Sequence, residues 1–140
     1  MREVFPGRLW IGDGGDLLEP GRLERAGIRA LIHVALEERL PQLSRELLYC
    51  HFPLVDGAAN DPALVDLALQ TAAGLIRREI PTLVCCSGGM SRSPCIAAGA
   101  LAIAREIDPT ECLTLIARDQ PHDISPALWT LITQLVSTRQ

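Results

Sequence analysis

The segment from Cys86 to Ser93 combines residue types that can perform chemistry on a bound anion. It reads Cys-Ser-Gly-Gly-Met-Ser-Arg-Ser and lies between an apolar run and an alanine-rich stretch. A loop between a buried strand and a helix N-terminus can turn successive backbone N–H groups inward, and the helix dipole adds about half a positive charge at that point. The sequence therefore predicts an anion-binding loop.

Two side chains of this loop make phosphate the expected anion. Arg92 presents a planar guanidinium whose donors match two phosphate oxygens, and the dipole and Arg92 both favour a thiolate at Cys86. A thiolate facing a bound phosphate indicates phosphoryl transfer with Cys86 as nucleophile. Cys86 as a buried packing residue is the alternative, but its loop neighbours disfavour it. Arg92 as a plain helix-start residue is also disfavoured, because its charge opposes the dipole unless an anion compensates.

The surrounding sequence predicts strands that alternate with helices and hold this loop. Thr82 to Cys86 is typical of a buried strand, and Arg92 to Glu106 of an alanine-rich helix. Upstream we expect a hairpin over Glu3 to Gly12, a short helix over Leu17 to Gly27, and strands over Ile28 to Leu36 and Leu47 to Leu54.

Three further helices are marked by a capping residue followed by proline. Asp61-Pro62 begins one that reaches Ile80, and Asp108-Pro109 and Ser125-Pro126 begin the last two. The expected fold class is α/β, with a central, mostly parallel sheet of about four or five strands flanked by helices. With 140 residues, we expect one catalytic domain spanning 1–140.

Composition narrows the class of function. The net charge is −4, and all thirteen basic residues are arginines scattered along the chain, so we expect no nucleic-acid partner. No apolar run approaches the roughly 18 residues of a membrane span, and residues 1–6 lack a signal-peptide pattern, so we expect a cytoplasmic protein without a membrane partner. The five cysteines fit neither a secreted disulfide framework nor a zinc pattern, and we expect no metal.

Residues Val84 to Pro94 resemble the signature of the dual-specificity branch of the protein tyrosine phosphatases, in which five residues separate the cysteine from the arginine and Ser or Thr follows. Further landmarks of that family stand in the same order over nearly the whole chain: Leu9-Trp10-Ile11-Gly12, Gly27-Ile28, Phe52-Pro53-Leu54-Val55-Asp56 and Ile124-Ser125-Pro126. Low-molecular-weight phosphatases carry the motif near the N-terminus, and rhodanese-like proteins lack the upstream acid segment. The dual-specificity branch is therefore favoured.

The resemblance implies a two-step hydrolysis through a phosphocysteine on Cys86, without a cofactor. Asp56 would protonate the leaving oxygen and later deprotonate the attacking water, and Ser93 would hydrogen-bond the departing thiolate. The backbone amides of the phosphate loop would hold the equatorial oxygens; they belong to Ser87, Gly88, Gly89, Met90, Ser91 and Arg92. Asp61 competes with Asp56 as the acid, but its place before Pro62 is explained by helix capping.

The implied substrate is a phosphorylated protein, carrying phosphotyrosine and also phosphoserine or phosphothreonine, because the chain has no room for an insertion that builds a deep slot. Two positions depart from the family pattern: Cys85 replaces the usual histidine before the nucleophile, and Ala127 replaces an asparagine of many relatives. Two alternatives stay open. One is a catalytically weak phosphate-binding module, if the surroundings of Cys85 keep Cys86 protonated, and the other is a sulfurtransferase, which Asp56 disfavours.

Overall fold

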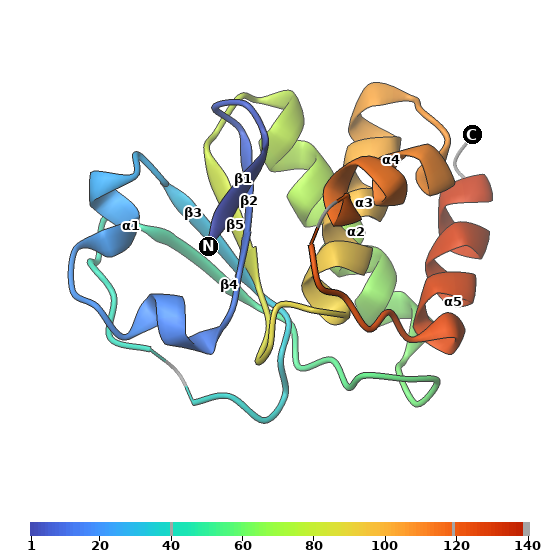
Figure 1. Ribbon diagram of the computed structural model, residues 1–140, viewed down its shortest axis with the longest axis horizontal. Coiled ribbons are helices and arrows are strands. Elements are labelled where there is room, and N and C mark those ends of the chain that lie inside the picture. The colour runs from blue at the N-terminus through green and yellow to red at the C-terminus, as the bar shows by residue number, and fades with distance from the viewer. Residues whose placement is uncertain (40, 119, 139–140) are drawn as a thin grey trace.

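A five-stranded sheet forms the centre of the fold in the computed structural model, which describes residues 1–39, 41–118 and 120–138. Its strand order is β1-β2-β5-β3-β4 (Figure 1). Only β1 is antiparallel to its neighbour, while β2, β5, β3 and β4 run parallel. The strands are β1 Arg2–Phe5, β2 Leu9–Gly12, β3 Ala30–His33, β4 Leu48–His51 and β5 Thr82–Cys85. The expected α/β class, with its mostly parallel sheet and its N-terminal hairpin, is confirmed.

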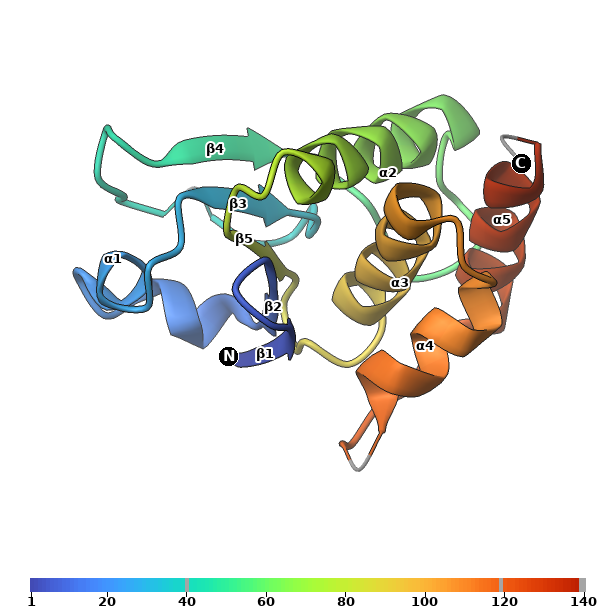
Figure 2. The same ribbon diagram turned by 90° about the horizontal axis from the view of Figure 1, so that it is seen from above.

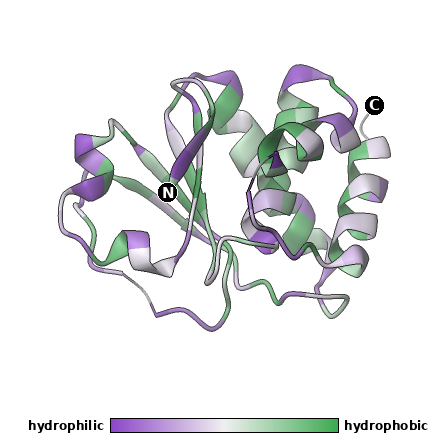
Figure 3. Cartoon of the chain, viewed as in Figure 1, coloured by the Kyte–Doolittle hydropathy of each residue, from purple (hydrophilic) through white to green (hydrophobic). Residues whose placement is uncertain are grey.

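Helices cover both faces of this sheet (Figures 1 and 2). One face carries the short helices η1 Gly14–Leu17 and α1 Arg22–Arg25, and the other carries α2 Pro62–Arg77, α3 Arg92–Arg105, α4 Pro109–Ala117 and α5 Pro126–Ser137. Each face has its own hydrophobic core, and β5 contributes Val84 to the larger core and Leu83 and Cys85 to the smaller one. This division follows from the alternation of side chains along a strand. In Figure 3, β3 and β5 carry mostly hydrophobic residues, whereas α1 is hydrophilic.

The three helices predicted from capping residues begin where the sequence indicates. In each, the cap side chain accepts a hydrogen bond from a backbone N–H of the first turn. The bonds run from Ala63 to Asp61 at 3.0 Å, from Glu111 to Asp108 at 3.2 Å and from Leu128 to Ser125 at 3.3 Å. These local signals therefore fix the starts of α2, α4 and α5.

The expected single helix over Leu17 to Gly27 is wrong. Leu17 ends the 3-10 helix η1, and α1 begins only at Arg22. Pro20 and Gly21 separate the two, because proline lacks an N–H and Gly21 takes a left-handed φ of 78°. The strands are also shorter than expected, since β3 spans Ala30–His33 and β4 spans Leu48–His51. A strand extends only as far as a neighbouring strand is hydrogen-bonded to it. The local sequence does not encode where that neighbour begins and ends.

The parallel strands end together at one edge of the sheet. Cys85 pairs with both Gly12 and His33, and His33 pairs in turn with His51. The segments that follow these strands therefore leave the same edge. They are residues 13–17 after β2, 34–39 after β3, 52–60 after β4 and 86–91 after β5, the last of which begins with Cys86.

Candidate active site

Cys86 is the first residue after β5, and its side chain is buried. Its Sγ accepts hydrogen bonds from the backbone N–H groups of Gly89 at 3.2 Å and Ser93 at 3.4 Å, and Ser93 Oγ lies 3.3 Å away. A thiol would donate its proton to that hydroxyl oxygen, whereas a thiolate would accept three hydrogen bonds. The arrangement therefore suits a sulfur that carries negative charge during a reaction.

The loop after Cys86 is held in shape from two sides. Gly89 has a left-handed φ of 71°, and a Cβ there would lie 3.1 Å from the carbonyl oxygen of Gly12, so glycine is required. The N–H of Gly14 donates to the carbonyl of Ser87 at 3.2 Å, and the N–H of Asp123 donates to the carbonyl of Met90 at 2.9 Å. The segments after β2 and before α5 thus brace the loop.

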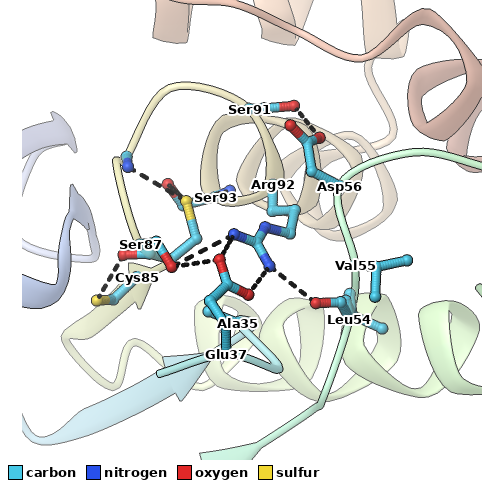
Figure 4. A network of polar contacts seen from close by, with 12 residues as sticks. Ala35, Glu37, Leu54, Val55, Asp56, Cys85, Ser87, Ser91, Arg92 and Ser93 are labelled. Atoms are coloured by element: carbon cyan, nitrogen blue, oxygen red, sulfur yellow. Dashed lines mark hydrogen bonds and ion pairs between the residues drawn. The ribbon is translucent and has the colours of Figure 1, made fainter. Parts of the chain in front are cut away.

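Arg92 begins α3, and its guanidinium is buried beside Cys86. Nη1 donates to Glu37 Oε1 at 2.7 Å and to the carbonyl of Leu54 at 2.9 Å, while Nη2 donates to Glu37 Oε2 at 2.5 Å (Figure 4). Ser87 Oγ also donates to Glu37 Oε2. Hydrogen bonding to Arg92 lowers the pKa of Glu37 to about 2, and the same contact raises the pKa of Arg92. Both charges therefore persist at neutral pH.

The sequence analysis did not single out Glu37, which lies between the two strands expected over Ile28 to Leu36 and Leu47 to Leu54. Its position carried a usable signal. Glu37 follows β3, and β3 lies next to β5, which ends at Cys85. A carboxylate just beyond the carboxyl end of β3, next to the strand that leads into Cys86, is a candidate counterion for the arginine of the loop.

Asp56 meets the loop through a hydroxyl. Ser91 Oγ donates to Asp56 Oδ1 at 2.6 Å and accepts from the backbone N–H of Ser125 at 3.0 Å. Asp61 instead accepts from the N–H of Ala63 at 3.0 Å and caps α2. The structure thus brings Asp56, Ser87, Ser91, Arg92 and Ser93 around Cys86, and leaves Asp61 in a capping role. Gly88 and Met90 lie on the exposed crest of the loop.

The side chain of Asn60 holds the segment that carries Asp56 in a turn. Asn60 Oδ1 accepts from the N–H of Val55 at 2.9 Å, and its Nδ2 donates to the carbonyls of Val55 at 2.8 Å and Gly57 at 3.1 Å. Three bonds from one amide close the turn that follows β4. The sequence analysis did not single out Asn60. Its partners are backbone groups, so no second side chain in the sequence marks the interaction.

The structure shows the surroundings of Cys85 and Ala127, the two positions that depart from the family pattern. Cys85 points into the smaller core, where burial raises its thiol pKa well above the usual range and its Sγ donates to the carbonyl of Cys86 at 3.6 Å. It therefore supplies no positive charge. Ala127 is exposed, and main-chain groups of Asp123 and Ser125 contact the loop instead.

The remaining cysteines are neutral packing residues. All five cysteines are free, and burial raises the pKa of Cys95 to about 12 and that of Cys112 to about 11. Among the described residues, no three His, Cys, Asp or Glu side chains are grouped so as to hold a metal ion. No helix within the described ranges has the length and apolar character needed to cross a bilayer.

Comparison with known proteins gives a result for structure but not for sequence. No family model matches the chain, and no curated protein matches it. Human DUSP28 matches with a TM-score of 0.85 and 20% identity, over 99% of this chain and 96% of that chain. A mouse putative dual specificity phosphatase, solved with zinc tungstate, matches with a TM-score of 0.84 and 21% identity, over 97% of this chain and 86% of that chain.

A third solved structure is a phosphatase-like protein by name. The human tyrosine phosphatase-like serine/threonine/tyrosine-interacting protein matches with a TM-score of 0.83 and 16% identity, over 99% of this chain and 96% of that chain. The chain therefore has the fold of a cysteine-based phosphatase. Within that class it has the fold of the dual-specificity phosphatases, as the resemblance of residues Val84 to Pro94 led us to expect.

Proposed function

We propose that this protein is a cysteine-dependent phosphatase that hydrolyses phosphorylated protein side chains through a phosphocysteine on Cys86. The observation that carries the proposal is the surroundings of the Cys86 sulfur. It is buried at the end of β5, faces the amides of Gly89 and Ser93 at 3.2 and 3.4 Å, and lies beside Arg92. A sulfur that only packed in a core would not need two backbone donors aimed at it.

In the first step the Cys86 thiolate attacks phosphorus, so that an S–P bond forms while the P–O bond to the side chain breaks. Arg92 and the amides of Ser87 through Arg92 hold the equatorial oxygens and stabilise the charge spread over them. Glu37 fixes the plane of the guanidinium through two hydrogen bonds. The step requires no metal ion, because fixed donors supply the electrostatic stabilisation.

Asp56 acts as the acid and then as the base. It gives its proton to the leaving oxygen in the first step and takes a proton from the attacking water in the second. Water then attacks phosphorus, the S–P bond breaks, and the sulfur leaves as a thiolate. Ser93 Oγ, 3.3 Å from Sγ, donates its hydrogen bond to that thiolate and so stabilises the leaving group.

Protein phosphotyrosine is the proposed substrate, with phosphoserine and phosphothreonine also admitted. None of the five loop residues between Cys86 and Arg92 is basic, which disfavours highly charged substrates such as polyphosphoinositides. We place this activity in the cytoplasm, in agreement with the composition of the chain.

A turnover assay on p-nitrophenyl phosphate and on phosphotyrosine peptides tests the proposal. The wild-type protein should hydrolyse both, whereas Cys86→Ser should lose turnover and still bind phosphate or sulfate, because the amides and Arg92 survive. Wild-type protein that binds phosphate without turnover would instead identify a phosphate-binding module. Turnover of thiosulfate would identify a sulfurtransferase.

The acid is tested by varying the leaving group. Asp56→Asn should slow phosphotyrosine peptides by roughly 10² to 10⁴, as expected for lost general acid catalysis, and should slow esters of very acidic phenols much less. Asp61→Asn is the matched control, since asparagine caps a helix about as well as aspartate. If only Asp61→Asn steepens the dependence of rate on leaving-group pKa, the two aspartates exchange roles.

A further inference from the structure

Ser91 differs from the other loop residues in that its hydroxyl bonds to two segments outside the loop. Its hydroxyl donates to Asp56 Oδ1 at 2.6 Å (Figure 4). The same oxygen accepts from the backbone N–H of Ser125 at 3.0 Å. Ser91 is 7% exposed, so water competes little for either bond. One hydroxyl thus joins the phosphate loop, the acid segment and the start of α5.

The bond from Ser125 determines where the hydroxyl proton of Ser91 points. A serine hydroxyl has one proton, which rotates to suit its partners. Because Ser125 N–H occupies a lone pair of Ser91 Oγ, the hydroxyl proton points to Asp56. The position of Ser125 is itself fixed, since it is the capping residue of α5 and its Oγ accepts from the N–H of Leu128 at 3.3 Å.

Asp56 is consequently held by one of its two oxygens. Oδ1 accepts from Ser91, whereas Asp56 as a whole is exposed. A second anchor lies two residues earlier, where the carbonyl of Leu54 accepts from Arg92 Nη1 at 2.9 Å. Two consecutive residues of the phosphate loop, Ser91 and Arg92, therefore anchor the acid segment at Asp56 and at Leu54.

We infer that Ser91 is a positioning residue for the general acid: its hydroxyl occupies Oδ1 of Asp56, so that Oδ2 carries the proton that passes to the leaving oxygen. The inference rests on the proposed phosphatase function and adds a residue to it. When the P–O bond breaks, the proton on Oδ2 moves to the leaving oxygen and Asp56 becomes a carboxylate. Ser91 keeps its own proton throughout, and its hydrogen bond then stabilises the new negative charge.

Kinetics of Ser91→Ala across aryl phosphates of different leaving-group pKa test the inference. The variant should be about tenfold slower with phenols as basic as tyrosine, a part of the 10² to 10⁴ supplied by the acid, and within about twofold of wild type with very acidic phenols. Competitive inhibition by phosphate should be unchanged, because both bonds of the hydroxyl are made to protein groups. A lower phosphate affinity with a uniform loss of rate would overturn the inference, since Ser91 would then bind the substrate.

Ser87→Ala is the matched control, because it removes a hydroxyl of the same loop that bonds to Glu37 and not to Asp56. It should lower the rate for all leaving groups by one factor. In an Asp56→Ala background, Ser91→Ala should cost nothing more, since no acid remains to be positioned. A further loss in that background would contradict the inference and leave the phosphatase intact.

Hydrogen exchange separates this failure from a failure of the proposed function. In Ser91→Ala, the amides of Ser125 and Val55 should exchange about tenfold faster than in wild type, because their segments lose a shared anchor. Unchanged exchange overturns the positioning role whatever the kinetics. Absence of turnover in the wild-type protein overturns the phosphatase and with it the catalytic part of the inference.

Discussion

At the level of single residues, the guanidinium of Arg92 is held by the carboxylate of Glu37. Both terminal nitrogens contact Glu37, and Nη1 also reaches the carbonyl of Leu54. Lysine could keep the charge but not this forked geometry. Arg92→Lys should therefore lower kcat about 10²-fold, comparable to removing one donor to a transition-state oxyanion. Steady-state kinetics measure the loss, and Arg45→Lys at an exposed position is the control. A near-normal kcat in Arg92→Lys would show that Arg92 contributes its charge but not its forked geometry.

The Glu37 carboxylate makes a prediction about pH. Its pKa falls from 4.5 to about 2 on folding, because Arg92 hydrogen-bonds the charged form. A depressed carboxyl pKa contributes stability that is present above the unfolded value of 4.5 and lost as pH falls toward about 2. The Glu37 side chain is 54% exposed, so solvent screening limits the contribution to about 1 kcal/mol.

Urea unfolding of wild type and Glu37→Gln at several pH values measures this contribution. Wild type should be the more stable of the two at neutral pH, and the difference should shrink as pH falls below about 4.5. A difference that is constant across this range would show that the Glu37 charge does not contribute to stability.

At the level of secondary structure, predictions succeeded where the deciding interaction lies within a few residues. The starts of α2, α4 and α5 follow from a cap and a proline next to it. They failed where a distant partner decides, as for the ends of β3. The same distinction explains the site: the loop from Cys86 to Ser93 was evident as a local motif, whereas Glu37 lies 55 residues before Arg92 and joins it only because β3 and β5 are neighbours.

The turn that carries Asp56 depends on Asn60 and gives a prediction at this level. Asn60→Ala removes three bonds to the backbone of Val55 and Gly57, so the segment after β4 should loosen. We expect a loss of about 1–3 kcal/mol in unfolding free energy, because half-buried backbone groups lose partners. Activity should fall most for basic leaving groups, since Asp56 is displaced. Urea unfolding and leaving-group kinetics check both effects, and wild-type values in both would show that Asn60 does not shape the turn.

At the level of the whole molecule, α3 connects the site to the helical layer. It begins with Arg92 and Ser93, all residues from Arg92 to Ile103 are buried, and it packs against α2, α4, α5 and β5. Figure 2 shows α3 lying among α2, α4 and α5. The alanines and Gly99 of α3 make close packing possible. The phosphate loop thus rests on a helix that neighbouring elements fix along its length.

Gly99, in the middle of α3, tests how closely that layer is packed. A Cβ at this position would lie 2.6 Å from Leu69 Cδ2 of α2 and 2.7 Å from Ile132 Cγ2 of α5, and both neighbours are fully buried. Gly99→Ala should therefore destabilise the protein by about 1–3 kcal/mol, as overpacking outweighs the gain in helix propensity of about 0.5–1 kcal/mol.

Gly74 in α2 is the matched control, because its Cβ would meet only the end of the flexible Arg78 side chain at 3.2 Å. Gly74→Ala should stabilise the protein by about 0.5–1 kcal/mol through helix propensity alone. The midpoints of urea unfolding of the two variants should therefore move in opposite directions. If Gly99→Ala also makes the protein more stable, α3 is not closely packed against its neighbours. The helical layer would then not hold Arg92 and Ser93 in place.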